Sequence, residues 1–576
     1  MTYAAPLADM RFTLDAVAPL PADAAELAGA VLEEAAKFAA NELAPLNPVG
    51  DRVRSVLENG VVRTPAGWRD AYRQYVEAGW NGLATAEEHG GQGLPLTLAV
   101  PVIEMWNSAC MSWALCPLLN HGALAMLEAH GSPEQKAVYL AKMVSGEWTG
   151  TMNLTEPQAG SDLGALRTRA VPGHDSRWGE HYRISGQKIF ITYGDHDLTD
   201  NIVHMVLART PDAPPGSRGI SLFLVPKFLP DESGAPSRRN DIRTLRLEEK
   251  LGIHASPTCV LSYGEEDGAI GWRIGPENRG LECMFTMMNS ERLLVGVQGV
   301  AIAERAYQHA RDYARSRVQG YPAGAPRAAG GPPPIIDHPD VRRMLLSMRV
   351  GTEAMRALTY YAAAAIDEAR HAEDDETRAR AQRRADLLIP VVKGWCTDLA
   401  NEIASTGVQV HGGVGYVEET GAAQYLRDAR ILPIYEGTNG IQANDLVGRK
   451  LARDGGAAAR ELFDEIRATL GELAAPELGR LHHRLTDGLA ALEYATERLV
   501  AADPAAAAAG SAPYLTLFGL VAGGWLTARM ALAGSGDTTR LATARFYAEH
   551  YLARAPGYLP GVEDGGAVAA FDPDRL

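Results

Sequence analysis

The sequence predicts a mainly α-helical protein that contains one small β domain. Apolar residues recur at three- and four-residue spacing over the first 150 residues and again after residue 280. Between these regions, short runs rich in β-branched and aromatic residues alternate with clusters of Gly, Pro, Asp and Asn, which is typical of short strands. The length of 576 residues exceeds what one core usually fills, so about four domains are expected.

The first domain is expected to be helical and to cover residues 1–150. AELAGAVLEEAAKFAANEL and WRDAYRQYVEAGW carry the helical spacing most clearly, and the glycine-rich EHGGQGLP interrupts it. A β domain is expected at 151–275, where HYRISGQKIFITYG, NIVHMVLAR and GISLFLVPKF predict strands of a sandwich or barrel.

The helical period returns in a third domain, expected at 276–450. Its helices are long enough for a bundle, and the proline- and glycine-rich segment 320–334 is expected to be an exposed connection between two of them. Further helical patterns after residue 450 predict a helical extension over 451–576.

Charge and cysteine usage exclude several classes of protein. The net charge is −16, so the average surface repels nucleic acid and anionic lipid, and neither is expected as a partner. The N-terminal residues do not resemble a secretory signal, and the most apolar run, 518–534, is broken by Thr527 and Arg529; a cytoplasmic protein without a membrane span is expected. Five scattered cysteines favour buried thiols over disulfides or a zinc site, and no metal is expected.

Two motifs stand out, and others follow them in order. MNLTEPQAGSD covers 152–162 and GQKIFITYG covers 186–194. The segment 290–299, Arg317, the segment 409–415 and IYEGTNGIQ at 434–442 come later in the chain. In this combination the sequence resembles the acyl-CoA dehydrogenase family of flavoenzymes over about residues 24–449. The resemblance implies a helical domain, a β domain and a four-helix bundle, with FAD between the last two.

The resemblance also assigns residues of the β domain to the flavin. Leu154 and Thr155 are expected against the ring system, and Thr192 near its reactive nitrogen N5. Phe190 stands where many members have Trp, a stacking role that another aromatic residue can fill. Ser161 is expected at the mouth of the pocket, near the FAD phosphates and the CoA arm of the substrate. For the two threonines, strand propensity is the alternative explanation.

A second set of cofactor residues lies in the bundle. By the same resemblance, Arg317 binds the FAD pyrophosphate of a neighbouring subunit, because a planar guanidinium donates two hydrogen bonds to a phosphate. Gln409, Gly413 and Thr438 correspond to further FAD contacts. A shared cofactor implies a homodimer or homotetramer.

The expected reaction needs a base that removes a proton α to a thioester. Glu436 in IYEGT matches the usual base of the family, and a raised pKa is expected for it. Some branches place the base at the position of Glu291; that residue is an alternative base, a residue that tunes Glu436, or a surface partner of Arg292. Arg292 matches a residue that binds the CoA portion of the substrate, for which Ser161 and Glu436 are also expected contacts.

The expected function is therefore FAD-dependent oxidation of an acyl-CoA to a trans-2-enoyl-CoA, with an electron-transfer flavoprotein as acceptor. An acyl-CoA oxidase that uses oxygen and a DNA-associated flavoprotein of the adaptive-response type are alternatives, and the acidic net charge opposes the second. The extension after residue 449, the N-terminal YAAPLADMRFTLD and RVQG at 317–320 resemble the branch that contains 3-methylmercaptopropionyl-CoA dehydrogenase, which implies a short acyl group.

Overall fold

The computed structural model describes residues 3–324 and 331–576, and these form two compact units. The first unit holds residues 3–37, 95–108 and 292–576, and the second holds 38–94 and 109–291. Helices α5 (Leu96–His130) and α8 (Gly280–Ser316) contribute residues to both. Of the connection expected at 320–334, residues 325–330 lie outside the described residues.

The first unit is helical. Besides its parts of α5 and α8, its helices are α1 (Leu7–Val17), α2 (Ala22–Phe38), α9 (Pro339–His371), α10 (Asp375–His411), α11 (Ala422–Ala429), α12 (Asn439–Asp445), α13 (Ala452–Asp454), α14 (Ala457–Glu472), α15 (Gly479–Ala501), α16 (Pro504–Ala533), α17 (Thr538–His550), α18 (Leu559–Glu563) and α19 (Gly565–Ala570). The two longest of these helices, α9 and α10, follow one another in the chain and pack along each other, as expected for a bundle.

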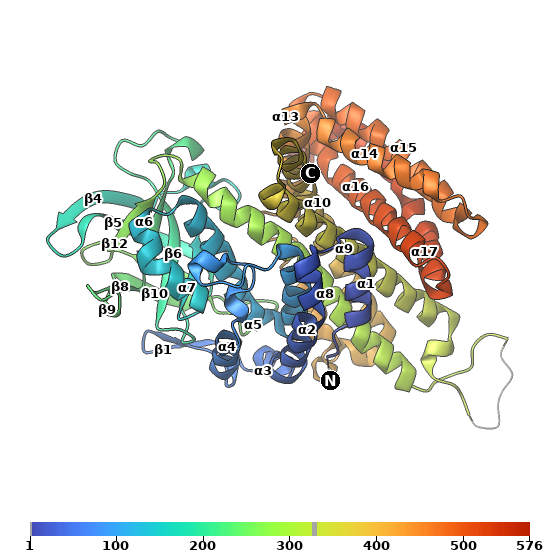
Figure 1. Cartoon of the computed structure of the whole chain (residues 1–576), viewed down its shortest axis with the longest axis horizontal. Coiled ribbons are helices and arrows are strands. Elements are labelled where there is room, and N and C mark those ends of the chain that lie inside the picture. The colour runs from blue at the N-terminus through green and yellow to red at the C-terminus, as the bar shows by residue number, and fades with distance from the viewer. Residues whose placement is uncertain (1–2, 325–330) are drawn as a thin grey trace. The chain divides into compact units, whose positions relative to one another are not determined.

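The C-terminal extension packs onto this bundle through α16. In Figure 1 the orange and red helices α14–α17 lie alongside α9 and α10, and α16 contacts both. The approach is close because α16 carries Gly519 where it meets Trp395 of α10; a Cβ at this position would overlap the indole. The extension is therefore part of the core of this unit.

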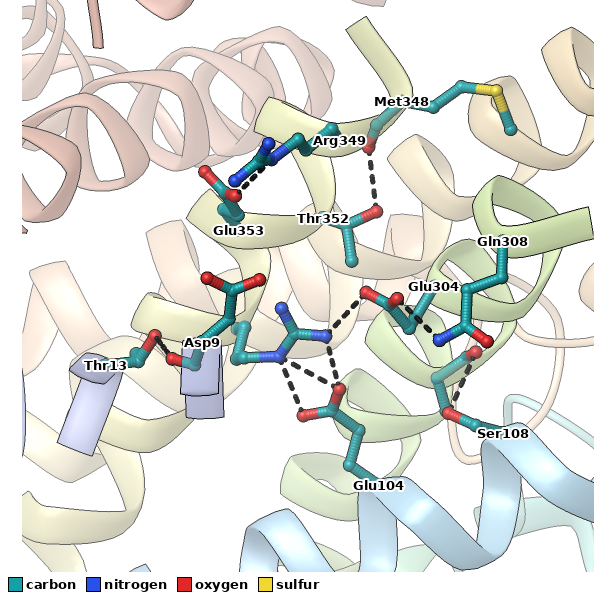
Figure 2. Close-up of polar contacts among 12 residues, drawn as sticks. Asp9, Thr13, Glu104, Ser108, Glu304, Gln308, Met348, Arg349, Thr352 and Glu353 are labelled. Carbon is teal, nitrogen blue, oxygen red and sulfur yellow. Dashed lines mark hydrogen bonds and ion pairs between the residues drawn. The ribbon is translucent and has the colours of Figure 1, made fainter. Parts of the chain in front are cut away.

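A buried charged network joins α5, α8 and α9 within the same unit. Arg356 of α9 is 1% exposed and bonds Glu104 of α5 at 2.7 Å and Glu304 of α8 at 2.8 Å. Figure 2 shows the two carboxylates pointing toward one guanidinium. The Tyr360 hydroxyl donates to Glu104 at 2.7 Å. Each of the three helices thus contributes one charged side chain to the network, and each charge has a partner on another helix. This matters because an unpaired buried charge is costly.

The second unit contains the β domain. Its shorter helices are α3 (Leu46–Arg52), α4 (Trp68–Glu77), α6 (Pro133–Gln135) and α7 (Ala141–Ser145). Its strands are β1 (Val56–Glu58), β2 (Val61–Arg63), β3 (Trp148–Asn153), β4 (Arg169–Asp175), β5 (Gly179–Thr192), β6 (Asn201–Ala208), β7 (Ser221–Pro226), β8 (Phe228–Pro230), β9 (Pro236–Arg239), β10 (Ile242–Leu247), β11 (Thr258–Tyr263) and β12 (Ala269–Ile274).

The main sheet contains both β3 and β5, with three strands between them. Its order is β10-β11-β5-β12-β7-β6-β3, with β4 paired to β5; β3 and β6 run parallel and the other pairs are antiparallel. One face packs a core with the C-terminal part of α5 and the start of α8, to which Leu127, Trp148, Leu222 and Met284 contribute. Strands β1 and β2 form a separate hairpin.

Two of the described helices are long and apolar enough to cross a bilayer when judged by length and composition alone, α5 and α16. The share of the most apolar stretch that is buried inside the protein is 89% in α5 and 61% in α16. Core helices of soluble proteins have the same character. The apolar run 518–534 of the sequence covers the C-terminal part of α16.

Candidate active site

The proposed base, Glu436, lies in the loop between α11 and α12. Its backbone has a φ of 58°, and Gly437 follows with a φ of 83°. Left-handed backbone is uncommon for a residue with a side chain and persists where the surroundings enforce it. Two such residues in succession turn the chain sharply at Glu436. The conformation of this loop therefore depends on the side chains that hold it in place.

Side chains from several helices of the first unit anchor the loop. The Tyr435 hydroxyl donates to Gln298 of α8, whose own amide donates to Asn107 of α5 at 3.0 Å. Gln442 of α12 donates to the Glu436 carbonyl at 3.1 Å. From α10, the Lys393 ammonium donates to the Gly437 carbonyl at 2.8 Å. The loop is thus held on both sides of Glu436.

The electrostatics of this site suit a base. Glu436 is half-buried, and burial raises its pKa to about 7, against the attraction of Arg292 and Lys393 for the ionised form. A carboxyl group in this range is substantially ionised at neutral pH and is a much stronger base than a solvated glutamate. The raised pKa expected from the sequence is confirmed.

Arg292 of α8 lies close to this loop: a Cβ on Gly437 would be 3.8 Å from one of its terminal nitrogens. It is 4% exposed, and one of its terminal nitrogens lies 3.5 Å from a carboxylate oxygen of Asp445 on α12. Burial lowers the pKa of the Arg292 guanidinium, while Asp445 and Glu436 raise it. A buried arginine beside a carboxylate and close to Glu436 can bind an anionic or carbonyl group of a ligand.

The second acid, Glu291, is 0% exposed and belongs to the other unit. Its carboxylate packs on Gly122 of α5, where a Cβ would overlap it. Because both Glu291 and Arg292 are buried, the surface ion pair considered from the sequence is wrong. A role of Glu291 in tuning or replacing the base stays a prediction.

In the second unit, the two sequence motifs of the β domain lie side by side. The Ile189 N–H donates to the Thr155 carbonyl at 2.9 Å, and the Lys188 ammonium donates to the Leu154 carbonyl at the same distance. The Thr151 hydroxyl of β3 donates to the carbonyl of Thr192, the last residue of β5, at 2.7 Å. The residues expected at the flavin ring therefore come together at the ends of β3 and β5.

A buried ion pair fixes this arrangement. The Lys188 ammonium lies 2.9 Å from Glu156, and their side chains are 0% and 4% exposed. Burial opposes ionisation of Glu156, but the Lys188 charge and hydrogen bonds from Thr168 and Arg167 lower its pKa to about 2. Burial in turn lowers the pKa of Lys188 to about 8. These contacts give the TEPQAGSD loop one conformation.

Phe190 is the most unusual residue of this region. Its φ is 60°, which is left-handed and strained for an aromatic residue, and its side chain is 59% exposed. Thr155 and Thr192 are half-buried, and Leu154 is buried. The β3 and β5 ends thus present an exposed aromatic ring and two hydroxyl groups on a fixed backbone, an arrangement that fits a flat aromatic ligand with polar edges.

Four family models match the chain in order. They are described as the N-terminal domain (residues 26–147), the middle domain (151–265) and the C-terminal domain (278–451) of acyl-CoA dehydrogenases, and as an acetyl-CoA dehydrogenase C-terminal like domain (462–571). The chain belongs to the acyl-CoA dehydrogenase family.

Individual relatives support the same family assignment. A 3-methylmercaptopropionyl-CoA dehydrogenase of Ruegeria pomeroyi is 50% identical, with 98% of this chain and 99% of the relative covered. A broad-specificity linear acyl-CoA dehydrogenase of Mycobacterium tuberculosis is 33% identical, with 91% and 89% covered. Among solved structures, Caenorhabditis elegans ACDH-11 in complex with C11-CoA matches with a TM-score of 0.80 at 23% identity, covering 96% of this chain and 92% of that one. The chain is an acyl-CoA dehydrogenase.

The residues expected at the phosphates of FAD lie on the surface of the first unit. Arg317 is exposed, and its guanidinium donates to Gln319 at 2.7 Å. Gln409 and Gly413 are exposed at the end of α10, and a Cβ on Gly413 would meet no atom within 4 Å. An exposed arginine and an open glycine backbone are each groups that can contact a phosphate. In the second unit, Ser161 is also exposed.

Thr438 has a structural role that the sequence analysis did not assign. Its hydroxyl accepts the Ile441 N–H at 3.3 Å and thereby caps α12 at its N-terminus. The expected contact of Thr438 with FAD stays a prediction.

Sequence reasoning missed the residues that anchor the loop of this dehydrogenase. Lys393, Gln298 and Gln442 are each 0% exposed. Lys393 carried a signal, because it is a charged residue within the apolar run DLLIPVVKGWC of a long helix. Gln298 and Gln442 carried none, since an isolated glutamine in a helix is usually solvated.

Proposed function

We propose that this dehydrogenase oxidises 3-methylmercaptopropionyl-CoA or another short, unbranched acyl-CoA thioester to the trans-2-enoyl-CoA. The observation that carries the proposal is the 50% identity to a 3-methylmercaptopropionyl-CoA dehydrogenase, which extends over 98% of this chain and includes the C-terminal extension. The two proteins thus share the same architecture over nearly their whole lengths, the extension included.

In this mechanism Glu436 removes the proton from the α-carbon of the thioester. Its raised pKa of about 7 supports this role, because the carboxylate then holds the proton well after the transfer and still ionises at neutral pH. The Glu436 backbone N–H donates to the thioester oxygen, where negative charge develops as the proton leaves. Arg292 and Ser161 bind the CoA portion and hold the α-carbon at the carboxylate.

FAD, when bound, would supply the acceptor for the hydride of the β-carbon. Leu154, Thr155, Phe190 and Thr192 would hold its ring, and the exposed Phe190 side chain and the fixed ends of β3 and β5 support this role. The bundle would supply further contacts: Thr438 would contact FAD, and Arg317, Gln409 and Gly413 would bind the FAD of a neighbouring subunit, so the enzyme is a homodimer or homotetramer.

An electron-transfer flavoprotein in the cytoplasm serves as the electron acceptor. All five cysteines are buried, and none forms a disulfide within the described residues, as is usual in a reducing compartment; this supports the cytoplasm. An oxidase, in contrast, would form hydrogen peroxide from each turnover in air.

A panel of acyl-CoAs tests the substrate. Anaerobic bleaching of the flavin is followed with 3-methylmercaptopropionyl-CoA, butyryl-CoA, a branched short acyl-CoA and palmitoyl-CoA. The first two should react fastest, because one surplus or missing methylene in an apolar pocket is worth about 1–3 kcal/mol. An optimum at palmitoyl-CoA or at the branched substrate would refute the substrate assignment, and rapid peroxide formation in air would refute the acceptor.

A further inference from the structure

Lys393 lies where a lysine is costly. It is 0% exposed in the middle of α10, in a helical stretch whose other members are mostly apolar and buried: Val391, Val392, Trp395 and Cys396. Lysine is rarely buried to this extent unless its ammonium has partners, because the charge must leave water. The partners of Lys393 therefore indicate what this residue does.

Both hydrogen bonds of the Lys393 ammonium end at the loop of the proposed base. It donates to the Gly437 carbonyl at 2.8 Å and to the side-chain oxygen of Asn439 at 2.9 Å. Gly437 directly follows Glu436, and both have left-handed backbone. Asn439 is the first residue of α12 and also donates to Asp398 at 2.7 Å. The lysine thus bridges α10 to Gly437, the second residue of the strained turn, and to Asn439, the first residue of α12.

The ammonium carries a positive charge that hydrogen bonds to two oxygens do not by themselves require, and burying that charge is costly. A positive charge at the start of α12 is also opposed by the helix dipole. The charged groups that act on Lys393 are Glu436, Asp398 and Arg292. Burial lowers the pKa of Lys393 to about 7, Glu436 and Asp398 raise it, and Arg292 lowers it. Glu436 and Lys393 carry opposite charges when ionised, so each favours the charged form of the other.

We propose that Lys393 is a positioning residue for the base: it fixes the Glu436–Gly437 turn through the Gly437 carbonyl, and its charge favours the ionised carboxylate that accepts the α-proton. The proposal rests on the assignment of Glu436 as base. Lys393 itself touches neither the substrate nor the reacting atoms in this account.

The test compares the purified holoenzyme with Lys393→Gln, Lys393→Arg and, as a matched control, Lys450→Gln. Lys450 is a lysine of the same unit whose side chain is 10% exposed and lies 3.8 Å from Asp386 of α10. For each protein, FAD content is measured, and the anaerobic rate of flavin reduction by 3-methylmercaptopropionyl-CoA and by butyryl-CoA is recorded from pH 5.5 to 9.

Lys393→Gln should keep FAD and reduce the maximal rate by about 10–100-fold, because small displacements of a reacting group have effects of this order. The fall in rate on the acid side should also move to higher pH by about one unit, since the carboxylate loses a neighbouring cation. Lys393→Arg should keep the acid limb of the wild type and have an intermediate rate, and Lys450→Gln should match the wild type in both.

A Lys393→Gln enzyme with the rate and acid limb of the wild type would overturn the proposal. So would a uniform loss of rate with an unmoved acid limb, which is the signature of a merely structural lysine. If Lys393→Gln does not accumulate as holoenzyme, Lys393→Met takes its place: a lowered rate with the acid limb moved to higher pH supports the proposal, and an unmoved acid limb overturns it. Glu436→Gln is measured alongside, and full activity of that variant would refute the base assignment instead.

Discussion

The raised pKa of Glu436 predicts how the wild-type enzyme responds to pH. Burial raises the pKa of the Glu436 carboxyl group to about 7, from the ordinary value of 4.5 for a glutamate. Because only the carboxylate accepts the α-proton, the rate of flavin reduction should fall as pH decreases through 7. Above that point the base is ionised and the rate should level off.

The expected size follows from the pKa. With a pKa of about 7, about 9% of the enzyme is ionised at pH 6 and about 91% at pH 8, so the rate should differ about tenfold. A glutamate with the ordinary pKa of 4.5 would be about 97% ionised at pH 6, and the rates would be nearly equal. Anaerobic stopped-flow reduction with acyl-CoA well below saturation reports the ionisation of the free enzyme and measures this difference, with FAD content checked at each pH. A flat profile from pH 6 to 8 in an enzyme that keeps its FAD would refute the reasoning.

Two further predictions concern stability. Arg356→Met should lower the free energy of unfolding by about 3–5 kcal/mol, because Glu104 and Glu304 are then left in the core without their shared partner; chemical denaturation of the holoenzyme measures it. Gly519→Val should destabilise the first unit by about 1–3 kcal/mol or more, since the new side chain overlaps Trp395 where α16 meets α10; thermal unfolding followed by circular dichroism measures it.

Matched controls separate these effects from generic ones. Arg343→Met removes an arginine of the same helix as Arg356 whose ion pair with Asp340 is exposed, and it should change stability little. Gly471→Ala replaces a glycine of α14 near which a Cβ would meet no atom within 4 Å, and it should be neutral or stabilising. If the controls destabilise as much as Arg356→Met and Gly519→Val, the packing argument fails.

Local patterns in the sequence were sufficient to predict the fold class. The helical period and the runs of β-branched residues depend on neighbours along the chain, so they identify the bundle and the strands between 148 and 274. The hairpin of β1 and β2 was missed although its signal is present. Asn59 and Gly60 have φ values of 52° and 76°, as in a two-residue turn, and Asn-Gly between two valine-containing runs predicts such a turn.

The anchors of the site depend on long-range contacts and could not be predicted in this way. Glu436 was identified through its motif, but the lysine that holds its loop lies 43 positions earlier on another helix, as the numbering of Lys393 shows. The strain at Phe190 likewise comes from a backbone conformation that nothing in GQKIFITYG indicates. Burial and positive φ arise from tertiary packing, which a single sequence does not specify locally.

The most direct test of the central claim is the comparison of Glu436→Gln with Glu291→Gln in anaerobic flavin reduction. Glutamine keeps the shape of the side chain and removes the proton acceptor, so Glu436→Gln should retain FAD and bind acyl-CoA while the reduction rate falls by about 10²–10⁴-fold. Glu291→Gln should keep most of the activity of the wild type. An active Glu436→Gln enzyme together with an inactive, FAD-containing Glu291→Gln enzyme would contradict the account and place the base at Glu291.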